Sequence, residues 1–438
     1  MGAHMVVLGT FPDHGIVTFH ETGLPGAGAE PVSEHDCGMD RKWTGMLLAA
    51  AFPLSPAIAQ QAQPSGQQPA ATAAPAPAQA PSLGPSMTGP LHLNSDPLHV
   101  DGGPLGPIYV SGVISGLALE QDHPLAGDHE NRIDLSNGQV IVQNTQGVFQ
   151  FYLQAGGYSI PTLGTAYFNA KNYVRDTYGY LPVAYVKIVP TSDFNIEIGK
   201  LYTLQGAENA YTFQNFNIER GLLFNQTSTI NRGIQANYAH GPLSVSVALS
   251  DGYYSNRYNW LSGTFGYTVS PKDSVTFGAA ASLSDNGRST FATPTVLNNG
   301  QLYFLSWTHT DGPWTVQPYV QVGHIPTRTR VGIVHDATTY GGAILGKYSF
   351  NDQWALAARA EVIKSTGSLN NDAPNLVYGP GSGAWSLTLT PTWQKGIFFA
   401  RAEGSYVHAW HVTPGFGLGP DFNNKSQVRG LLEAGIIF

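Results

Sequence analysis

Charged residues are scarce in this 438-residue chain: Asp, Glu, Lys and Arg together make up 11% of it. A soluble domain usually carries about 25% charged residues, so this composition argues against an ordinary water-facing surface. Long apolar runs are missing too, because no stretch of about 20 consecutive apolar residues could form a transmembrane helix. Only helices and closed barrels satisfy all backbone polar groups inside a bilayer. The two deficits together favour a membrane β-barrel.

Cysteine and catalytic motifs are also nearly absent. The single cysteine, Cys37, cannot form a disulfide framework or a cysteine metal site. No G-x-S-x-G, H-E-x-x-H, phosphate-loop or Gly-rich dinucleotide pattern occurs. His408 and His411 have a spacing that could hold a metal, but no carboxylate accompanies them, and exposed histidines are the commoner explanation. We therefore predict no catalytic residues, no metal site, no cofactor and no enzymatic activity.

Residues 39–59 have the pattern of a secretory signal peptide. Arg41 and Lys42 precede a short apolar run, and small residues then supply a cleavage site that ends at Ala59. Because a signal peptide works from the N-terminus, we interpret residues 1–38 as a mis-called start or an added extension. Cleavage near Ala59 leaves 19 basic and 23 acidic residues, a net charge of −4, which argues against nucleic acid as a partner.

Residues 60–106 are rich in Ala, Pro and Gln. Such a composition cannot bury a hydrophobic core, so we expect a disordered periplasmic linker with some polyproline II structure. A tether that reaches toward the cell wall is the alternative interpretation.

From residue 107 to residue 438 the chain alternates between apolar and polar residues in sixteen segments. Successive side chains of a β-strand point to opposite faces, so each segment predicts a strand with two unlike faces. The segments are 108–119, 132–143, 148–157, 180–189, 193–201, 231–240, 243–250, 260–270, 273–284, 302–310, 313–323, 340–350, 353–364, 384–393, 396–407 and 428–438.

The connections between these segments alternate between short and long. Short breaks such as 241–242 and 271–272 contain turn residues, and each is flanked by longer connections such as 202–230. Outer-membrane barrels have this asymmetry and an even number of strands. The predicted fold is all-β: a transmembrane antiparallel β-barrel of about 16 strands over residues 107–438, with short periplasmic turns and long external loops.

The two faces of the segments distinguish this barrel from a soluble β-sandwich or propeller, which also alternates. In 243–250 and 384–393, the face opposite Ser and Thr is apolar and uncharged, whereas a soluble sheet would carry charges there. Trp314 and Trp354 follow short turns, at the level where aromatic residues concentrate in a membrane. Ordinary cross-strand aromatic packing would explain some of these positions equally well.

Sixteen strands make a barrel wide enough to hold a water channel. Neighbouring strands carry rows of arginine and glutamate that could create a transverse field and orient polar solutes. Alternatively, these charges form salt bridges that only stabilise the wall. The charged residues of lumen parity are Lys187, Glu197, Lys347, Arg359, Glu361, Arg401, Glu403, Arg429 and Glu433.

Three motifs carry a family resemblance. Residues 198–208 read I-G-K-L-Y-T-L-Q-G-A-E, residues 217–224 read N-I-E-R-G-L-L-F, and residues 233–238 read G-I-Q-A-N-Y. These motifs resemble the OmpL-like family of outer-membrane β-barrel porins (porin-2 type), and the similarity covers about residues 107–438. The resemblance implies a sixteen-strand porin in a Gram-negative outer membrane but brings no substrate with it.

Further expectations come from resemblance to outer-membrane barrels in general. Their third long loop folds into the lumen and narrows it, so we expect Glu208, Glu219 and Arg220 to lie near a constriction. General porins imply a homotrimer. The terminal Phe438 resembles the C-terminal signal of such barrels, which implies handling by the barrel-assembly machinery.

These features favour an outer-membrane porin, a passive diffusion channel for small hydrophilic solutes. Its partners would be outer-membrane lipid and the permeating solutes. An outer-membrane barrel enzyme, such as a hydrolase, and an adhesive or structural barrel are the alternatives. Open-channel conductance separates the porin from both of them.

Overall fold

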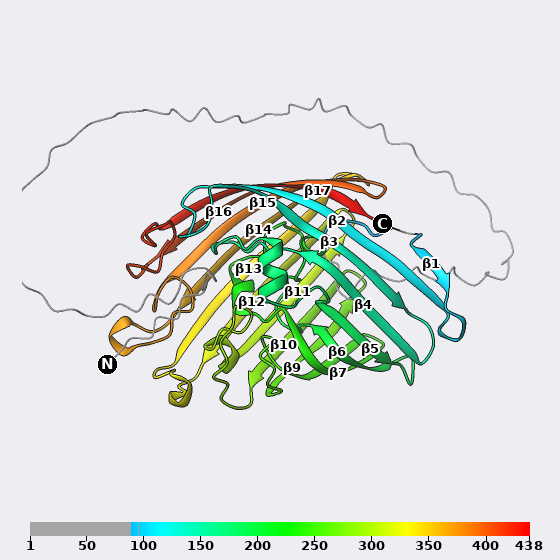
Figure 1. Cartoon of the computed structure of the whole chain (residues 1–438), viewed down its shortest axis with the longest axis horizontal. Helices are drawn as coiled ribbons and strands as arrows, with labels where there is room; N and C mark the ends of the chain where they lie inside the picture. The colour runs from blue at the N-terminus through cyan, green and yellow to red at the C-terminus, as the bar shows by residue number, and fades with distance from the viewer. Residues whose placement is uncertain (1–88, 95) are drawn as a thin grey trace, which may run out of the picture. The chain divides into compact units, whose positions relative to one another are not determined.

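Sixteen antiparallel strands, β2 to β17, pair one after another along the chain, and β17 pairs back with β2 to close a barrel (Figure 1). This computed structural model describes residues 89–94 and 96–438. All sixteen predicted segments are confirmed as strands, with ends that differ by a few residues. The expected extension 1–38, the signal peptide 39–59 and residues 60–88 of the expected linker lie outside the described residues.

The strands are bounded as follows: β1 (Leu98–Asp101), β2 (Pro107–Gln121), β3 (Asn131–Asn144), β4 (Phe149–Tyr158), β5 (Val183–Ile188), β6 (Phe194–Tyr202), β7 (Ile230–His240), β8 (Leu243–Ser250), β9 (Trp260–Ser270), β10 (Asp273–Ser282), β11 (Gln301–Asp311), β12 (Trp314–Ile325), β13 (Ala337–Ser349), β14 (Trp354–Ser365), β15 (Gly383–Lys395), β16 (Phe398–Trp410) and β17 (Ser426–Ile437). The helices are α1 (Ala170–Asp176), η1 (Gly103–Leu105), η2 (Thr212–Gln214), η3 (Leu223–Gln226), η4 (Leu297–Asn299), η5 (Thr329–Val331) and η6 (Leu369–Asn371).

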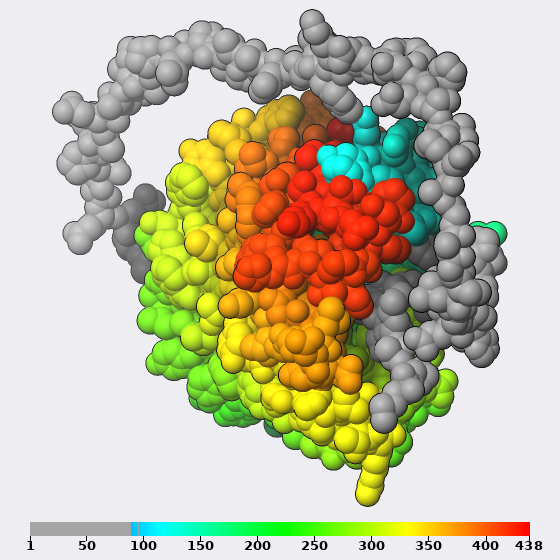
Figure 2. Space-filling view, turned by 90° about the vertical axis from the view of Figure 1, so that its left-hand side faces the viewer, coloured from blue at the N-terminus to red at the C-terminus, as the bar shows by residue number. Residues whose placement is uncertain are grey.

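A seam between the last and first barrel strands closes the sheet. Residues 429–437 of β17 pair with residues 113–121 of β2. Phe438 continues the pairing, because its backbone N–H donates to the Gly112 carbonyl at 3.0 Å and its carbonyl accepts from Gly112 N at 2.9 Å. Figure 2 shows the red end of the chain beside the cyan beginning of the barrel. Closure leaves neither β2 nor β17 as a free edge along this seam.

Connections at the two ends of the barrel differ in length, as predicted. Seven turns lie at the end where β2 begins and β17 ends, and eight longer loops lie at the other end. The second long loop, residues 159–182, contains α1, whose first turn is capped by Asn169 accepting from Asn172 N at 2.9 Å. This helix was not predicted, because seven residues are too few to show a helical apolar period.

The outer face of the barrel is apolar and uncovered. Leu389 is 55% exposed and Leu432 is 62% exposed, whereas Thr390, on the opposite parity of β15, is fully buried toward the lumen. An apolar outer band and a polar inner face are typical of a barrel wall in lipid.

Among the described residues, no helix has both the length and the apolar character that crossing a membrane requires.

Aromatic side chains gather on the outer face near the short turns. The Trp314 and Tyr348 rings lie 4.5 Å apart between centroids, and Phe350 meets Tyr348 edge-on at 5.0 Å. Trp314 and Tyr348 are also register partners on β12 and β13, yet Trp314 and Trp354 remain at least half exposed. Trp314 therefore both packs against a ring on the neighbouring strand and lies exposed on the outer face, where an interfacial aromatic residue is expected.

Within the expected disordered linker 60–106, the described residues include a strand, β1. β1 pairs with the first residues of β2, with Leu98 opposite Val110 and Asp101 opposite Pro107. These backbone groups of β2 extend beyond the end of β17, so β1 supplies their hydrogen-bond partners. Residues 89–94 are also placed, inside the barrel mouth, as described below.

The assignment of faces predicts opposite effects of one substitution at two sites. Leu389→Arg should destabilise the folded barrel by about 2–4 kcal/mol, because it puts a charge on the lipid face near the strand centre. Thr276→Arg, at a half-buried lumen-facing position of β10, should be tolerated. Urea unfolding in lipid vesicles, followed by tryptophan fluorescence, measures both. Greater damage from Thr276→Arg would mean that the faces are reversed.

Candidate functional site

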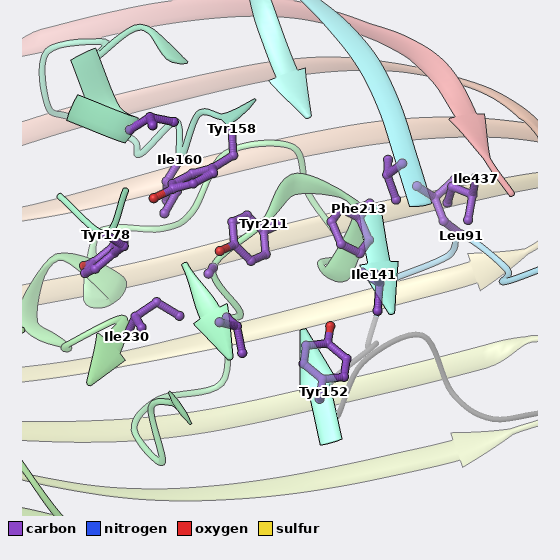
Figure 3. Close-up of a cluster of buried hydrophobic side chains, with 14 of the residues drawn as sticks. Leu91, Ile141, Tyr152, Tyr158, Ile160, Tyr178, Tyr211, Phe213, Ile230 and Ile437 are labelled. Carbon is purple, nitrogen blue, oxygen red and sulfur yellow. The ribbon is translucent and has the colours of Figure 1, made fainter. Parts of the chain in front are cut away.

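The third long loop, residues 203–229, folds back inside the barrel. Phe213 of this loop is fully buried and packs in one cluster with Ile141 of β3, Phe399 of β16 and Ile437 of β17 (Figure 3). Leu223 packs in a second cluster with lumen-facing side chains of β12 to β16. The loop therefore covers the inner side of one half of the wall.

Two wall glutamates bind the backbone of this loop. Glu403 accepts hydrogen bonds from the backbone N–H groups of Ile218 and Glu219, at 2.5 and 2.9 Å. Glu361 accepts from those of Leu222 and Leu223, at 2.9 and 3.3 Å. Buried backbone N–H groups need partners, and a carboxylate makes a stronger one than a neutral acceptor. The wall thus supplies hydrogen-bond partners for the backbone of a loop that has little secondary structure of its own.

Wall arginines bind the loop from the same side. Arg359 donates to Glu208 and to the Glu219 carbonyl, both at 2.7 Å. Arg429 donates to the Glu219 carboxylate at 2.8 Å. Arg401 donates to three loop carbonyls at 2.6–3.1 Å and lies 3.6 Å from the Glu433 carboxylate on β17. Arginine suits this position because its guanidinium carries several donors in a fixed geometry.

We call this set of charged side chains the loop clamp. Each of its members is at most 6% exposed, and its five glutamates face four arginines. Ion pairs buried in this way need full hydrogen bonding to offset the loss of hydration. The members are Glu208, Glu219, Arg220, Arg359, Glu361, Arg401, Glu403, Arg429 and Glu433.

The loop clamp corrects the expectation that these charges line a water-filled lumen. The third loop covers them, and Arg359, Arg401 and Arg429 are each at most 2% exposed. They therefore do not face water, as side chains that create a transverse field across a channel would. The arrangement agrees with the alternative of mutual salt bridges, with one addition: the partners lie on the loop as well as on the wall.

Gly221 sits where the clamp is tightest. Its N–H donates to Glu208 at 2.9 Å, and a Cβ at this position would collide with the Glu361 carboxylate. Next to it, Arg220 donates to the Ala210 carbonyl at 2.9 Å, while its Nε and Nη2 atoms have no partner among the described residues. Only a glycine permits this close approach of backbone to carboxylate.

The other three predicted charges lie near the short turns, outside the clamp. Lys187 of β5 and Glu197 of β6 are register partners, with 3.7 Å between the ammonium and the carboxylate. Lys347 is half-buried near the end of β13. The structure thus separates the twelve predicted residues into nine in the clamp and three near this mouth of the barrel.

Opposite the clamp, strands β7 to β12 form a wall whose half nearer the long loops is covered: lumen-facing Ser262, Ser306 and Gln321 are buried there. The half nearer the short turns is open. Its lumen-facing side chains include exposed Ser244, Thr268 and Thr310 and half-buried Thr264 and Gln317. At the lumen-facing positions of these strands, the sequence has no Asp, Glu, Lys or Arg. We call this surface the polar wall. The alternation in the sequence predicted that its hydroxyl and amide groups face inward, but it did not predict which of them are exposed to solvent.

A cavity of 380 Å³ separates the third loop from the polar wall. Its lining includes Gln205 and Glu208 of the loop and Thr264, Thr276 and Gln317 of the wall. Glu208, itself bound to Arg359, is the one charged side chain in this lining.

A segment before the barrel, residues 89–94, enters the lumen at the short-turn end. Gly89 N donates to the Gln214 carbonyl of the third loop at 3.2 Å. Leu91 is 4% exposed and belongs to the same cluster as Phe213 (Figure 3). His92 exchanges two hydrogen bonds with Gln394 of β15, at 2.7 and 2.8 Å. Two leucines, Leu91 and Leu93, beside a Pro- and Ala-rich stretch gave no sequence signal for this insertion.

The sequence profile of the family described as "Putative beta-barrel porin-2, OmpL-like" matches residues 107–438. The chain belongs to this family. The matched region contains every strand of the closed barrel, from β2 to β17, so the chain is a porin-like outer-membrane barrel. No curated protein matches the sequence.

Solved outer-membrane proteins share the fold at low sequence identity. Outer-membrane-expressed OmpT of Vibrio cholerae is 11% identical, with a TM-score of 0.51 over 78% of this chain and 100% of OmpT. The outer membrane channel DcaP of Acinetobacter baumannii is 10% identical, with a TM-score of 0.51 over 76% of this chain and 97% of DcaP. These likenesses concern the fold alone.

The clamp predicts that removal of one wall arginine loosens the loop. Arg359→Met should weaken the packing of residues 203–229 by about 3–5 kcal/mol, because it leaves Glu208 and Glu361 buried with fewer partners. Hydrogen exchange of the loop peptides measures this release while the barrel strands stay protected. Lys272→Met is the matched control, because the Lys272–Asp311 pair is exposed and should change little. Unchanged loop protection in Arg359→Met would contradict the clamp.

The inserted segment predicts a local effect at Leu91. Leu91→Asp should release residues 89–94 from the lumen, because it puts a carboxylate among apolar side chains. Hydrogen exchange at Gly89 and His92 should then become fast. Leu98→Asp changes an exposed residue of β1 and should leave both amides protected; equal exchange in the two variants would argue against insertion.

Proposed function

We propose that this protein is a passive diffusion channel of the outer membrane for small hydrophilic solutes. The observation that carries the proposal is the asymmetry of the lumen: one wall is covered by the third loop, and the polar wall opposite is exposed in its half nearer the short turns. Solutes would pass between the two. The distance from loop to polar wall would set the size limit, and the clamp would keep that distance fixed.

The charge distribution supports weak discrimination between ions. The clamp pairs five glutamates with four arginines, so most of their charge cancels and at most one excess negative charge acts beyond it. What a solute meets in the 380 Å³ cavity is mainly hydroxyl and amide groups, which replace the hydrogen bonds of hydration for neutral and charged solutes alike. Lys187, Glu197 and Lys347 near the short turns add a small field at that mouth.

The orientation follows from the same proposal. Export would depend on the signal peptide at 39–59, the short turns would face the periplasm, and the long loops would face outward. The Phe438 strand end would be recognised by the barrel-assembly machinery. A homotrimer remains the expected assembly.

One pair of tryptophan substitutions on β9 tests the path. Thr264→Trp should lower single-channel conductance in planar bilayers, because it fills the cavity beside the third loop. Val269→Trp changes a lipid-facing residue that is 60% exposed and should leave conductance unchanged. Liposome swelling with neutral, cationic and anionic solutes of graded size then gives the cut-off.

The rival functions make different predictions in the same assay. A folded barrel without open-channel steps, but with hydrolytic activity, would support an outer-membrane enzyme. A sealed barrel that binds surfaces through its long loops would support an adhesin. Either result would remove the pore proposal, as would equal conductance in both tryptophan variants.

A further inference from the structure

A second cavity lies at the long-loop end, beside the clamp: the carbonyls of two of its lining residues, Thr162 and Thr165, accept hydrogen bonds from Arg429. Its volume is 220 Å³, and four loops line it: residues 159–182, 203–229, 251–259 and 283–300. At ~30 Å³ per water molecule this is room for about seven waters. The size suits a single small ring rather than a drug-sized ligand, which occupies about 300–1,000 Å³.

Aromatic rings from separate loops form part of this cavity. Phe168 stacks on Phe291 with 4.1 Å between ring centroids and 16° between ring planes. Tyr173 of α1 meets both rings edge-on, at 5.7 and 5.9 Å. Tyr178 and Tyr253 complete the aromatic part of the lining. Because the face of an aromatic ring is electronegative, it attracts weakly polarised C–H groups of a ligand.

Four hydroxyl groups of the lining donate their protons to backbone carbonyls. Thr165 donates to the Thr162 carbonyl at 2.9 Å, and Thr177 to the Tyr173 carbonyl at 2.5 Å. Thr227 donates to the Phe224 carbonyl at 2.8 Å, and Tyr253 to the Gln226 carbonyl at 2.7 Å. Each hydroxyl oxygen keeps lone pairs that can only accept. The cavity therefore suits a ligand that donates several hydrogen bonds.

Charge is absent from this lining. None of its residues is Asp, Glu, Lys, Arg or His. An ionic ligand would lose hydration without gaining a counter-charge, so the cavity selects against carboxylates, phosphates and amines.

We propose that this cavity is a binding site for an uncharged, polyhydroxylated ring, of the size and chemistry of a monosaccharide. The ring's hydroxyl groups donate to the Thr and Tyr oxygens, and its C–H face packs on the aromatic rings. The site lies at the long-loop mouth, where a solute would meet the protein before reaching the gap beside the polar wall. Occupancy needs no conduction, so the site stands apart from the channel proposal.

Calorimetric titration of the full-length protein in detergent tests this site. D-glucose is the probe, D-glucuronate is its charged counterpart with the same ring, and triethylene glycol dimethyl ether is a neutral probe without hydroxyl donors. Glucose should bind saturably, and both counterparts should bind at least about tenfold more weakly. Absence of saturable glucose binding, or equal binding of either counterpart, overturns the proposal.

Three variants locate the binding. Phe291→Ala should weaken glucose binding by about tenfold, because it removes one ring of the stack. Thr177→Val should weaken it by removing an acceptor oxygen. Tyr258→Ala, an exposed ring outside the lining, should change nothing, and heat-modifiable electrophoresis verifies folding of all three. Glucose affinity that is the same in Phe291→Ala and Tyr258→Ala overturns the site. If the unsubstituted protein binds glucose but shows no channel conductance in planar bilayers, the channel proposal is refuted and the binding site is not.

Discussion

The shape of the lumen depends on one interaction: carboxylates of the barrel wall accept hydrogen bonds from backbone N–H groups of the third loop. A stretch of 27 residues with only two single-turn helices crosses the inside of the barrel, and its amides would be costly to bury without partners. Glu361 and Glu403 supply those partners, Arg359 and Arg401 bind loop carbonyls, and Arg429 binds the Glu219 carboxylate. These hydrogen bonds fix the loop together with the apolar packing of Phe213 and Leu223.

This use of charge leaves the polar wall without it. Nine ionised side chains are concentrated in one buried cluster, and the polar wall carries hydroxyl and amide groups instead. Solvent meets neutral groups over most of the cavity beside the loop. The inserted segment at Gly89 and Leu91 adds a second layer below the loop, on the side of the short turns.

The strands were predictable and the interior was not, for one physical reason. Alternation with a period of two depends only on neighbouring residues, so it gave all sixteen strands and the inward direction of Arg359 and Glu403. Whether an inward charge meets water depends on where a loop far along the chain lies. Nothing local to Gly221 or Leu91 indicates that one touches a carboxylate and the other enters the lumen. The short helix α1 was missed because it spans fewer than two full turns.

The seam has a consequence for how such a molecule can be assembled. Arg429 and Glu433 belong to β17, the last strand to be synthesised, yet they complete the surroundings of Glu219 and Arg401. Arg401 lies on β16 and is the register partner of Glu433, whereas Arg429 reaches across to Glu219 of the third loop. The strand that closes the barrel against β2 is therefore also a strand that supplies counter-ions to the buried interior.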